Sequence, residues 1–306
     1  MNVAASLGYG SQERLLIINA DDYGLCQSTN KGIQQLLQER AVSSATIMMP
    51  CKSSREAALW SANHPEYDVG IHFTFTSEWD TYRWGPVNKA GDTHSLITSE
   101  GYFPKDCRTF ELQADPQQVK KEMIAQVEAA LQLGMNPTHA DNHMGSLYGL
   151  ETGKNFLKEV FEVCSAYGLP FRMPRKVAAA NGQMVPPELE EQARQLGLLA
   201  HAMGVVVLDY LLGLPFPLQQ GDTYDTVKAN LKQLLKQLQP GVTELLFHPS
   251  LVTDELLTFH GQPDKRGMEF QLFRDPEIHK ALQSEGIKVI RWSDLQQVQK
   301  AVYGRP

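Results

Sequence analysis

The hydrophobic positions of the sequence follow two alternating patterns. Short apolar runs rich in β-branched residues predict strands, and longer stretches with apolar residues at every third or fourth position predict helices that bury one face. Asn30–Arg40 and Val119–Gly134 are two such helical stretches. The runs that predict eight strands lie at 15–20, 45–49, 68–75, 138–143, 171–174, 205–210, 243–248 and 288–292.

This regular alternation of strand and helix predicts an α/β fold with mostly parallel strands and outer helices. Eight strands favour a distorted, TIM-barrel-like (β/α) barrel that occupies residues 1–306 as a single domain. A doubly wound open sheet is the competing architecture, because both folds alternate strand and helix in the same way. The segment 77–116 interrupts the pattern and predicts a long, aromatic-rich insertion loop, either a lid or a packed structural element.

Composition narrows the class of partner. The chain has a net charge of −7 and no block of Lys or Arg, which argues against nucleic acid or an anionic membrane surface. No apolar run is long enough to span a membrane and the first residues lack a signal-peptide pattern, so we expect a cytoplasmic protein. The four cysteines contain no CxxC pair and indicate neither a thiolate zinc site nor a disulfide framework. The sequence leaves the choice between monomer and homodimer open.

Polar residues with reactive side chains gather where predicted strands end. Asp21 and Asp22 follow the first run, His72 lies in GIHFTF, and His248 follows TELLF. The fourth predicted strand, THADNH at 138–143, carries two more histidines and an aspartate. Because the carboxyl ends of parallel strands share one face of an α/β fold, we expect these side chains to meet in one pocket.

A divalent metal is the simplest reason for this gathering. Two adjacent carboxylates are costly to bury unless a cation compensates them, and one carboxylate with two imidazoles suits Zn²⁺ or another transition metal. Other readings exist for single residues: Asp21 and Asp22 also fit a turn with a helix cap, and His72 also fits a hydrogen-bonded core histidine. His139, Asp141 and His143 would share one strand face under strict alternation, which favours a common site.

The ordered motifs NADDYG, VSSATIMM, GIHFTFTSEW, PTHADNH and ELLFHP resemble those of the YdjC-like carbohydrate deacetylases, which include chitooligosaccharide and hopanoid-type enzymes. The resemblance spans nearly the whole chain and implies a distorted (β/α) barrel that removes N-acetyl groups from an amino sugar, oligosaccharide or glycoconjugate. It implies further that Asp22, His72 and His143 hold one metal ion, that Asp21 is the general base and that His248 is the general acid.

One departure from the family pattern concerns the residues after His143. The family commonly continues with further histidines, whereas this chain has Met144, Gly145 and Ser146. The departure leaves the implied metal ligands intact and changes the surroundings in which a substrate would bind. We expect one divalent ion, Zn²⁺ or Mg²⁺, whose identity the sequence does not settle; the two imidazoles favour a transition metal.

Several more residues are candidates for orienting ligands or contacting substrate. His139 and Asp141 could orient the metal-binding imidazoles, and Arg172 could pair with a catalytic carboxylate or form an ordinary surface ion pair. Three aromatic residues of the insertion could form a platform for a sugar face, with packing in the core as the alternative: Trp79, Tyr82 and Trp84. The run Arg266–Glu269 could close over the site or form a helical i,i+3 pair.

Two other functions compete with deacetylation. A phosphoesterase or cyclic amidase could use the same aspartates and histidines, although the chain has no Gly-rich phosphate loop. A non-catalytic sugar-binding protein could keep the barrel and the metal, but it would have no need to retain both a candidate base and a candidate acid.

Overall fold

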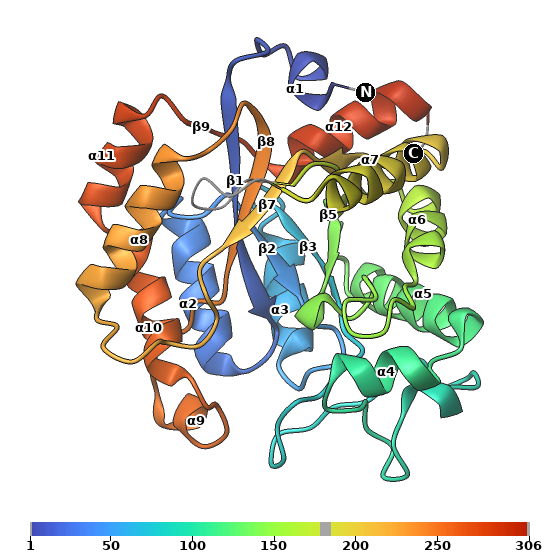
Figure 1. Cartoon of the computed structure of the whole chain (residues 1–306). Helices are drawn as coiled ribbons and strands as arrows, with labels where there is room; N and C mark the ends of the chain where they lie inside the picture. Colours follow the sequence, from blue (N-terminus) through green and yellow to red (C-terminus); the bar gives the residue numbers. More distant parts are fainter. Residues whose placement is uncertain (1, 178–184, 305–306) are drawn as a thin grey trace.

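A computed structural model describes residues 2–177 and 185–304 (Figure 1). Within these residues one sheet contains nine strands, all paired in parallel. The strands are β1 (Arg14–Tyr23), β2 (Ser44–Ile47), β3 (Val69–Phe73), β4 (Ala140–Asn142), β5 (Phe171–Pro174), β6 (Val207–Leu208), β7 (Tyr210–Gly213), β8 (Gly241–Phe247) and β9 (Lys288–Val289).

Helices separate most of these strands along the chain and cover the outside of the sheet (Figure 1). They are α1 (Val3–Ser6), α2 (Gln27–Gln38), α3 (Ser54–Asn63), α4 (Cys107–Gln113), α5 (Pro116–Gln132), α6 (Leu157–Ala166), α7 (Pro187–Ala202), α8 (Tyr224–Lys236), α9 (Asp254–Leu257), α10 (Pro263–Leu272), α11 (Pro276–Ser284) and α12 (Trp292–Tyr303), with two 3-10 turns, η1 (His94–Leu96) and η2 (His143–Gly145). None of the described helices is long and apolar enough to cross a membrane.

The sheet curls until its two ends nearly meet. Its strand order is β6-β5-β4-β3-β2-β1-β8-β7, and only Asp209 separates β6 from β7 in the chain. β6 pairs with β5 and β7 pairs with β8. Because β6 and β7 are nearly continuous in the chain, the two ends of the sheet lie next to each other. The predicted distorted (β/α) barrel is confirmed, and the strand predicted at 205–210 is divided at Asp209.

The ninth strand lies outside this path. β9 pairs with β1 at Leu15 and Leu16, below the point where β2 begins to pair with β1 at Asn19. A separate apolar cluster surrounds this end of the barrel and includes Val3 and Trp292 from the two ends of the chain. The first and last helices, α1 and α12, therefore lie away from the carboxyl ends of the strands (Figure 1).

The segment 77–116 contains local structure and is not one continuous loop. It holds η1 and α4, and its side chains Trp84, Phe103 and Phe110 are buried in the main hydrophobic core. Figure 1 shows α4 at the end of the barrel towards which β1 points. Much of this segment is thus a packed element that borders the carboxyl ends of the strands.

Candidate active site

Two consecutive carboxylates, Asp21 and Asp22, reach the same site because the end of β1 is irregular. In a regular strand, neighbouring side chains point to opposite faces. Here the pairing of β1 with β2 shifts register between Ala20 and Tyr23, and Asp22 has a φ of 66°, in the left-handed region that Asp tolerates better than most residues. This bulge turns both carboxylates towards residues of β3, β4 and β5.

Asp22, His72 and His143 come together as the resemblance implied. Asp22 Oδ1 lies 3.4 Å from His72 Nε2 and 3.2 Å from His143 Nδ1, and one ligand atom from each residue lies within 4.8 Å of the others. All three side chains are buried, and within the described part of the chain neither Asp22 Oδ1 nor His72 Nε2 has a hydrogen-bond partner. Such buried orphan atoms are costly, so this group fits a divalent cation bound by one oxygen and two imidazole nitrogens.

Each imidazole is backed by a carboxylate on its other nitrogen. Asp141 lies 2.5 Å from His72 Nδ1, and Glu78 lies 3.1 Å from His143 Nε2. Carboxylates in this position orient metal-binding histidines and make them more basic. Sequence reasoning considered Asp141 for this role and missed Glu78, which lies inside the quoted motif GIHFTFTSEW but beyond the end of its strand, where no periodicity predicts direction.

The neighbouring carboxylates also raise the pKa values of the two histidines. Burial lowers the pKa of His72, but the charge of Asp141 and its hydrogen bond outweigh burial and raise that pKa to about 10. Burial likewise lowers the pKa of His143, while Glu78 and Asp22 raise it to about 9. For Asp22, burial raises the pKa, whereas Arg266 and the two imidazoles hold it well below its usual range.

Asp21 is held by a buried guanidinium. Arg172 Nη1 and Nη2 donate to the two carboxylate oxygens of Asp21 at 2.7 and 2.6 Å, so Arg172 forms no ordinary surface ion pair. Burial raises the pKa of Asp21, but Arg172 lowers it to about 2, and the carboxylate stays ionised at neutral pH. Arg172 also contacts Asp141 and Glu244, and burial raises the pKa of Glu244 to about 8 despite this arginine. Sequence reasoning missed Glu244, which sits inside an apolar run.

His248 lies beside Asp21, and His139 lies further inside the barrel. His248 Nε2 is 3.8 Å from Asp21 Oδ2, and burial lowers the pKa of His248. His139 stacks on Trp292 and its Nε2 lies 3.2 Å from Asn19 Oδ1, while Asn19 donates its amide to Asp21 at 2.8 Å. His139 therefore supports Asp21 through Asn19 and contacts none of the three candidate ligands.

The site opens into a cavity of about 610 Å³. Its wall includes Asp21, Asp22, Glu78, Trp79, Asn142, His143, Met144, Tyr148, Leu150, Arg172, Leu211, Phe216, Leu246, His248, His260 and Arg266. Much of this wall is apolar, and three of its large apolar side chains are exposed: Met144, Leu150 and Phe216.

Only one of the three aromatic residues proposed as a sugar platform lines this cavity. Trp79 lies in the wall. Trp84 is buried and donates its indole N–H to the carbonyl of Thr76, and Tyr82 donates its hydroxyl to the carbonyl of Leu25. Trp84 thus packs in the core, which is the alternative to a sugar platform. Tyr82 stacks on the ring of Phe259 and does not line the cavity.

The late run Arg266–Glu269 does reach the site, through its arginine. Arg266 is buried in α10 and forms an ion pair with Asp22 Oδ2. Glu269 pairs instead with Lys265 at 2.7 Å and accepts a hydrogen bond from the backbone N–H of His248 at 2.8 Å. The i,i+3 pair considered from the sequence is therefore not formed.

Comparison with known proteins places the fold and the site in a family. The family model described as "YdjC-like protein" matches residues 15–284. The chain belongs to the YdjC-like family. The match includes β2 to β8, all of β1 except Arg14, and the candidate metal ligands, base and acid, so the YdjC-like assignment rests on the same part of the chain as the geometry.

Three similar proteins extend this picture of the YdjC-like chain. A carbohydrate deacetylase of Thermus thermophilus is 28% identical over 92% of this chain and 94% of its own length. A chitooligosaccharide deacetylase of Yersinia enterocolitica is 25% identical over 92% and 99%. A crystal structure of a candidate cellobiose-phosphate cleavage protein from Enterococcus faecalis superposes with a TM-score of 0.72, at 23% identity over 92% and 99%, which supports the fold.

Proposed function

We propose that this chain is a divalent-metal-dependent deacetylase that hydrolyses the N-acetyl group of an amino sugar, oligosaccharide or glycoconjugate. The observation that carries the proposal is the buried cluster of Asp22, His72 and His143 with two orphaned atoms. Asp22 and His143 line the same cavity as the ionised Asp21 and His248. Relatives named carbohydrate deacetylase or chitooligosaccharide deacetylase, aligned over 92% of the chain, support the choice of reaction.

The proposed roles follow from these positions. Asp22, His72 and His143 would hold the cation, which supplies Lewis acidity that makes water a better nucleophile and polarises a carbonyl group. Asp21, kept ionised by Arg172, accepts the proton of the attacking water. The water oxygen bonds to the acetyl carbon, the carbon–nitrogen bond breaks, and acetic acid and a free amine form; the acid then gives its remaining proton to the amine.

The amine nitrogen needs a proton to depart, and His248 is placed to give it. Its ring borders the cavity on the Asp21 side, with 3.8 Å between His248 Nε2 and Asp21 Oδ2. At this separation a modest movement lets the proton taken up by Asp21 pass to His248. The two residues would thus carry one proton from water to the leaving nitrogen, which balances the reaction without an external acid.

Acetate release from N-acetylglucosamine oligomers by the metal-loaded protein tests the proposal. Asp21→Asn should lower kcat by about 10²–10⁴-fold, the usual contribution of a general base, while metal binding measured by calorimetry is retained. Asp80→Asn, which changes an exposed carboxylate of the insertion, is the control and should leave kcat unchanged. Unchanged turnover in Asp21→Asn would reject the base, and absence of acetate release by the wild-type protein with every acetylated sugar and metal tried would reject the deacetylase.

A further inference from the structure

Arg266 lines the cavity, and one of its guanidinium nitrogens has no hydrogen-bond partner among the described residues. α10 buries its guanidinium, leaving 1% of the residue exposed. Nε donates to His260 Nε2 at 2.6 Å, and Nη2 donates to Asp22 Oδ2. Nη1 is buried and has no hydrogen-bond partner among residues 2–177 and 185–304, although the side chain lines the cavity.

An unpaired guanidinium N–H in a buried position is expensive, because the group loses water and gains nothing in exchange. Arginine stays protonated, so the group cannot avoid this cost by losing its charge. The two occupied nitrogens, held by groups from different parts of the chain, fix the plane of the fork and hence the direction of the free donor. A fixed cationic donor of this kind is suited to an oxygen atom that enters the cavity with a ligand.

The position of this donor relates it to the reacting group. Nη1 and Nη2 are bonded to the same guanidinium carbon, and Nη2 donates to the Asp22 carboxylate. Nη1 is therefore close to that carboxylate as well. Arg266 also occupies Asp22 Oδ2, which leaves Oδ1 as the oxygen that faces His72 and His143. The unpaired guanidinium nitrogen and the candidate metal ligand Asp22 therefore belong to neighbouring side chains that line one cavity.

We infer that Arg266 is a catalytic residue of this enzyme: its Nη1–H binds the acetyl oxygen of the substrate and stabilises the negative charge that develops there. This inference rests on the proposed deacetylation. When the water oxygen bonds to the acetyl carbon, the electron pair of the carbonyl double bond moves onto its oxygen. Arg266 stabilises that oxygen until the pair returns and expels the nitrogen, which takes its proton from His248. Donors fixed in advance at such an oxyanion are among the largest contributions to catalysis.

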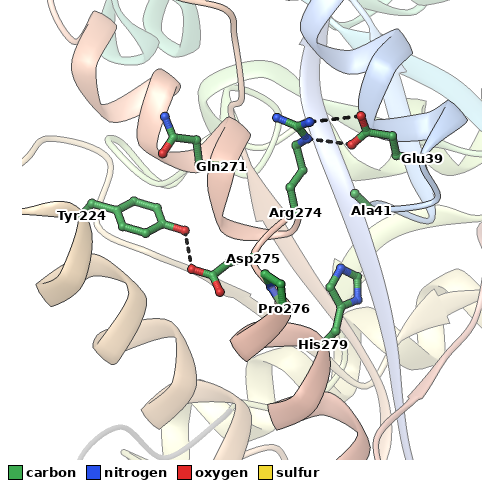
Figure 2. A pocket seen from close by; sticks show the side chains of 8 residues that line it. All are labelled: Glu39, Ala41, Tyr224, Gln271, Arg274, Asp275, Pro276 and His279. Atoms are coloured by element: carbon green, nitrogen blue, oxygen red, sulfur yellow. Dashed lines mark hydrogen bonds and ion pairs between the residues drawn. The ribbon is translucent and has the colours of Figure 1, made fainter.

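Arg266→Ala tests this role, with Arg274→Ala as the matched control. Arg274 lies two residues beyond the end of α10 and forms an exposed pair with Glu39, beside a separate surface cavity (Figure 2). Arg266→Ala should lower kcat for acetate release by about 10²–10³-fold, the cost of losing one oxyanion donor, with a much smaller change in KM. Arg274→Ala should match the wild-type protein in both constants.

Two further measurements separate catalysis from support of Asp22. Guanidinium chloride at non-denaturing concentration should restore part of the lost kcat in Arg266→Ala, whereas sodium chloride at equal ionic strength should not. Binding of acetate to the metal-saturated proteins, measured by calorimetry, should be about 10–100-fold weaker in Arg266→Ala, as expected for loss of one charged hydrogen bond. Arg266→Lys, which keeps the charge and lacks the fork, replaces the alanine variant in all three assays if that variant fails to fold.

The outcomes distinguish this inference from the proposed function. No acetate release by the wild-type protein would reject the deacetylase itself. A wild-type protein that releases acetate while Arg266→Ala has the same kcat would overturn the role of Arg266 alone. A loss of kcat explained entirely by weaker metal binding, with no guanidinium rescue and unchanged acetate affinity, would also overturn it, because Arg266 would then serve only to hold Asp22.

Discussion

At the scale of single residues, the site combines a compact candidate metal-binding group with carboxylates that contact the outer ring nitrogens of its two histidines. His72 and His143 approach Asp22 Oδ1 through different ring nitrogens, and each uses its remaining nitrogen to contact Asp141 or Glu78. The two supports differ in surroundings, because Asp141 is fully buried whereas the Glu78 side chain is about a quarter exposed. Glu78 is therefore the support that can be changed without opening the core.

Glu78→Gln should weaken the affinity of the protein for Zn²⁺ by about 10–100-fold, the usual effect of removing a carboxylate behind a metal-binding histidine. Glutamine keeps the shape and one acceptor oxygen but loses the charge that makes His143 more basic. Competition with a chromophoric chelator measures the affinity. Glu100→Gln changes another glutamate of the same insertion, paired with Arg83 at the surface, and should leave the affinity unchanged. Equal affinities for wild type and Glu78→Gln would remove Glu78 from the site.

Some residues of the site could be predicted from the sequence and others could not. Asp22, His72 and His143 could be assigned because each lies at or just after the end of a strand, and parallel strands bring such ends together. Glu78 could not be assigned, and Arg266 could be named only as part of a run that could close over the site, without its contact to Asp22. Glu78 lies in a stretch without regular structure, and Arg266 reaches Asp22 from a helix 244 residues later in the chain, a contact that no local pattern encodes.

At the scale of elements, the strands fit each other closely at a glycine of β3. Gly70 lies on the same face of its strand as His72, and a Cβ there would come within 2.6 Å of both the ring and the backbone carbonyl of His139. The ring cannot easily withdraw, because it stacks on Trp292 with 4.8 Å between ring centroids. A larger residue at this position would force β3 and β4 apart below the metal-binding group.

Gly70→Ala should therefore destabilise the protein by about 1–3 kcal/mol, the usual range for overpacking a filled core. Urea denaturation followed by circular dichroism measures the difference in free energy of unfolding. In the control Gly10→Ala the nearest atom to the new Cβ is 3.9 Å away, so its effect should stay within about 0.5 kcal/mol. A Gly70→Ala protein as stable as the wild type would show that His139 and its neighbours can move aside.

Elements also show what the sequence could and could not predict about the fold. The runs at 15–20 and 243–248 appear as β1 and β8, because a strand buried on both faces is continuously apolar. The run at 205–210 contains Asp209, at which the pairing changes: β6, before Asp209, pairs with β5, and β7, after it, pairs with β8. The carboxylate of Asp209 accepts the backbone N–H of Val242 at 2.9 Å and pairs with Arg175. These contacts are distant in sequence, so the division of this strand could not be read from periodicity.

At the scale of the whole molecule, the barrel is what turns scattered residues into one site. β1, β3 and β4 carry the candidate ligands or lie next to them, while β5 and α10 supply the arginines that balance their charge. Within the described residues the cavity receives Asp21, Asp22, Arg172 and Arg266 from segments separated by more than 90 residues. Because a preformed group of this kind exists only in the folded chain, any cation that binds it must favour folding.

Metal binding should consequently raise the melting temperature. A cation present at one hundred times its dissociation constant stabilises the folded state by about 2.7 kcal/mol, which corresponds to a rise in Tm of about 4 °C for a chain of this size. Differential scanning fluorimetry of chelator-treated protein with added metal measures the shift, and two imidazole ligands predict a larger shift with Zn²⁺ than with Mg²⁺ at equal concentration. His143→Ala should lose the shift, whereas His94→Ala, which alters an exposed histidine, should keep it. A Tm that no divalent metal changes, or an equal rise in the His143→Ala protein, would contradict a metal centre at Asp22, His72 and His143.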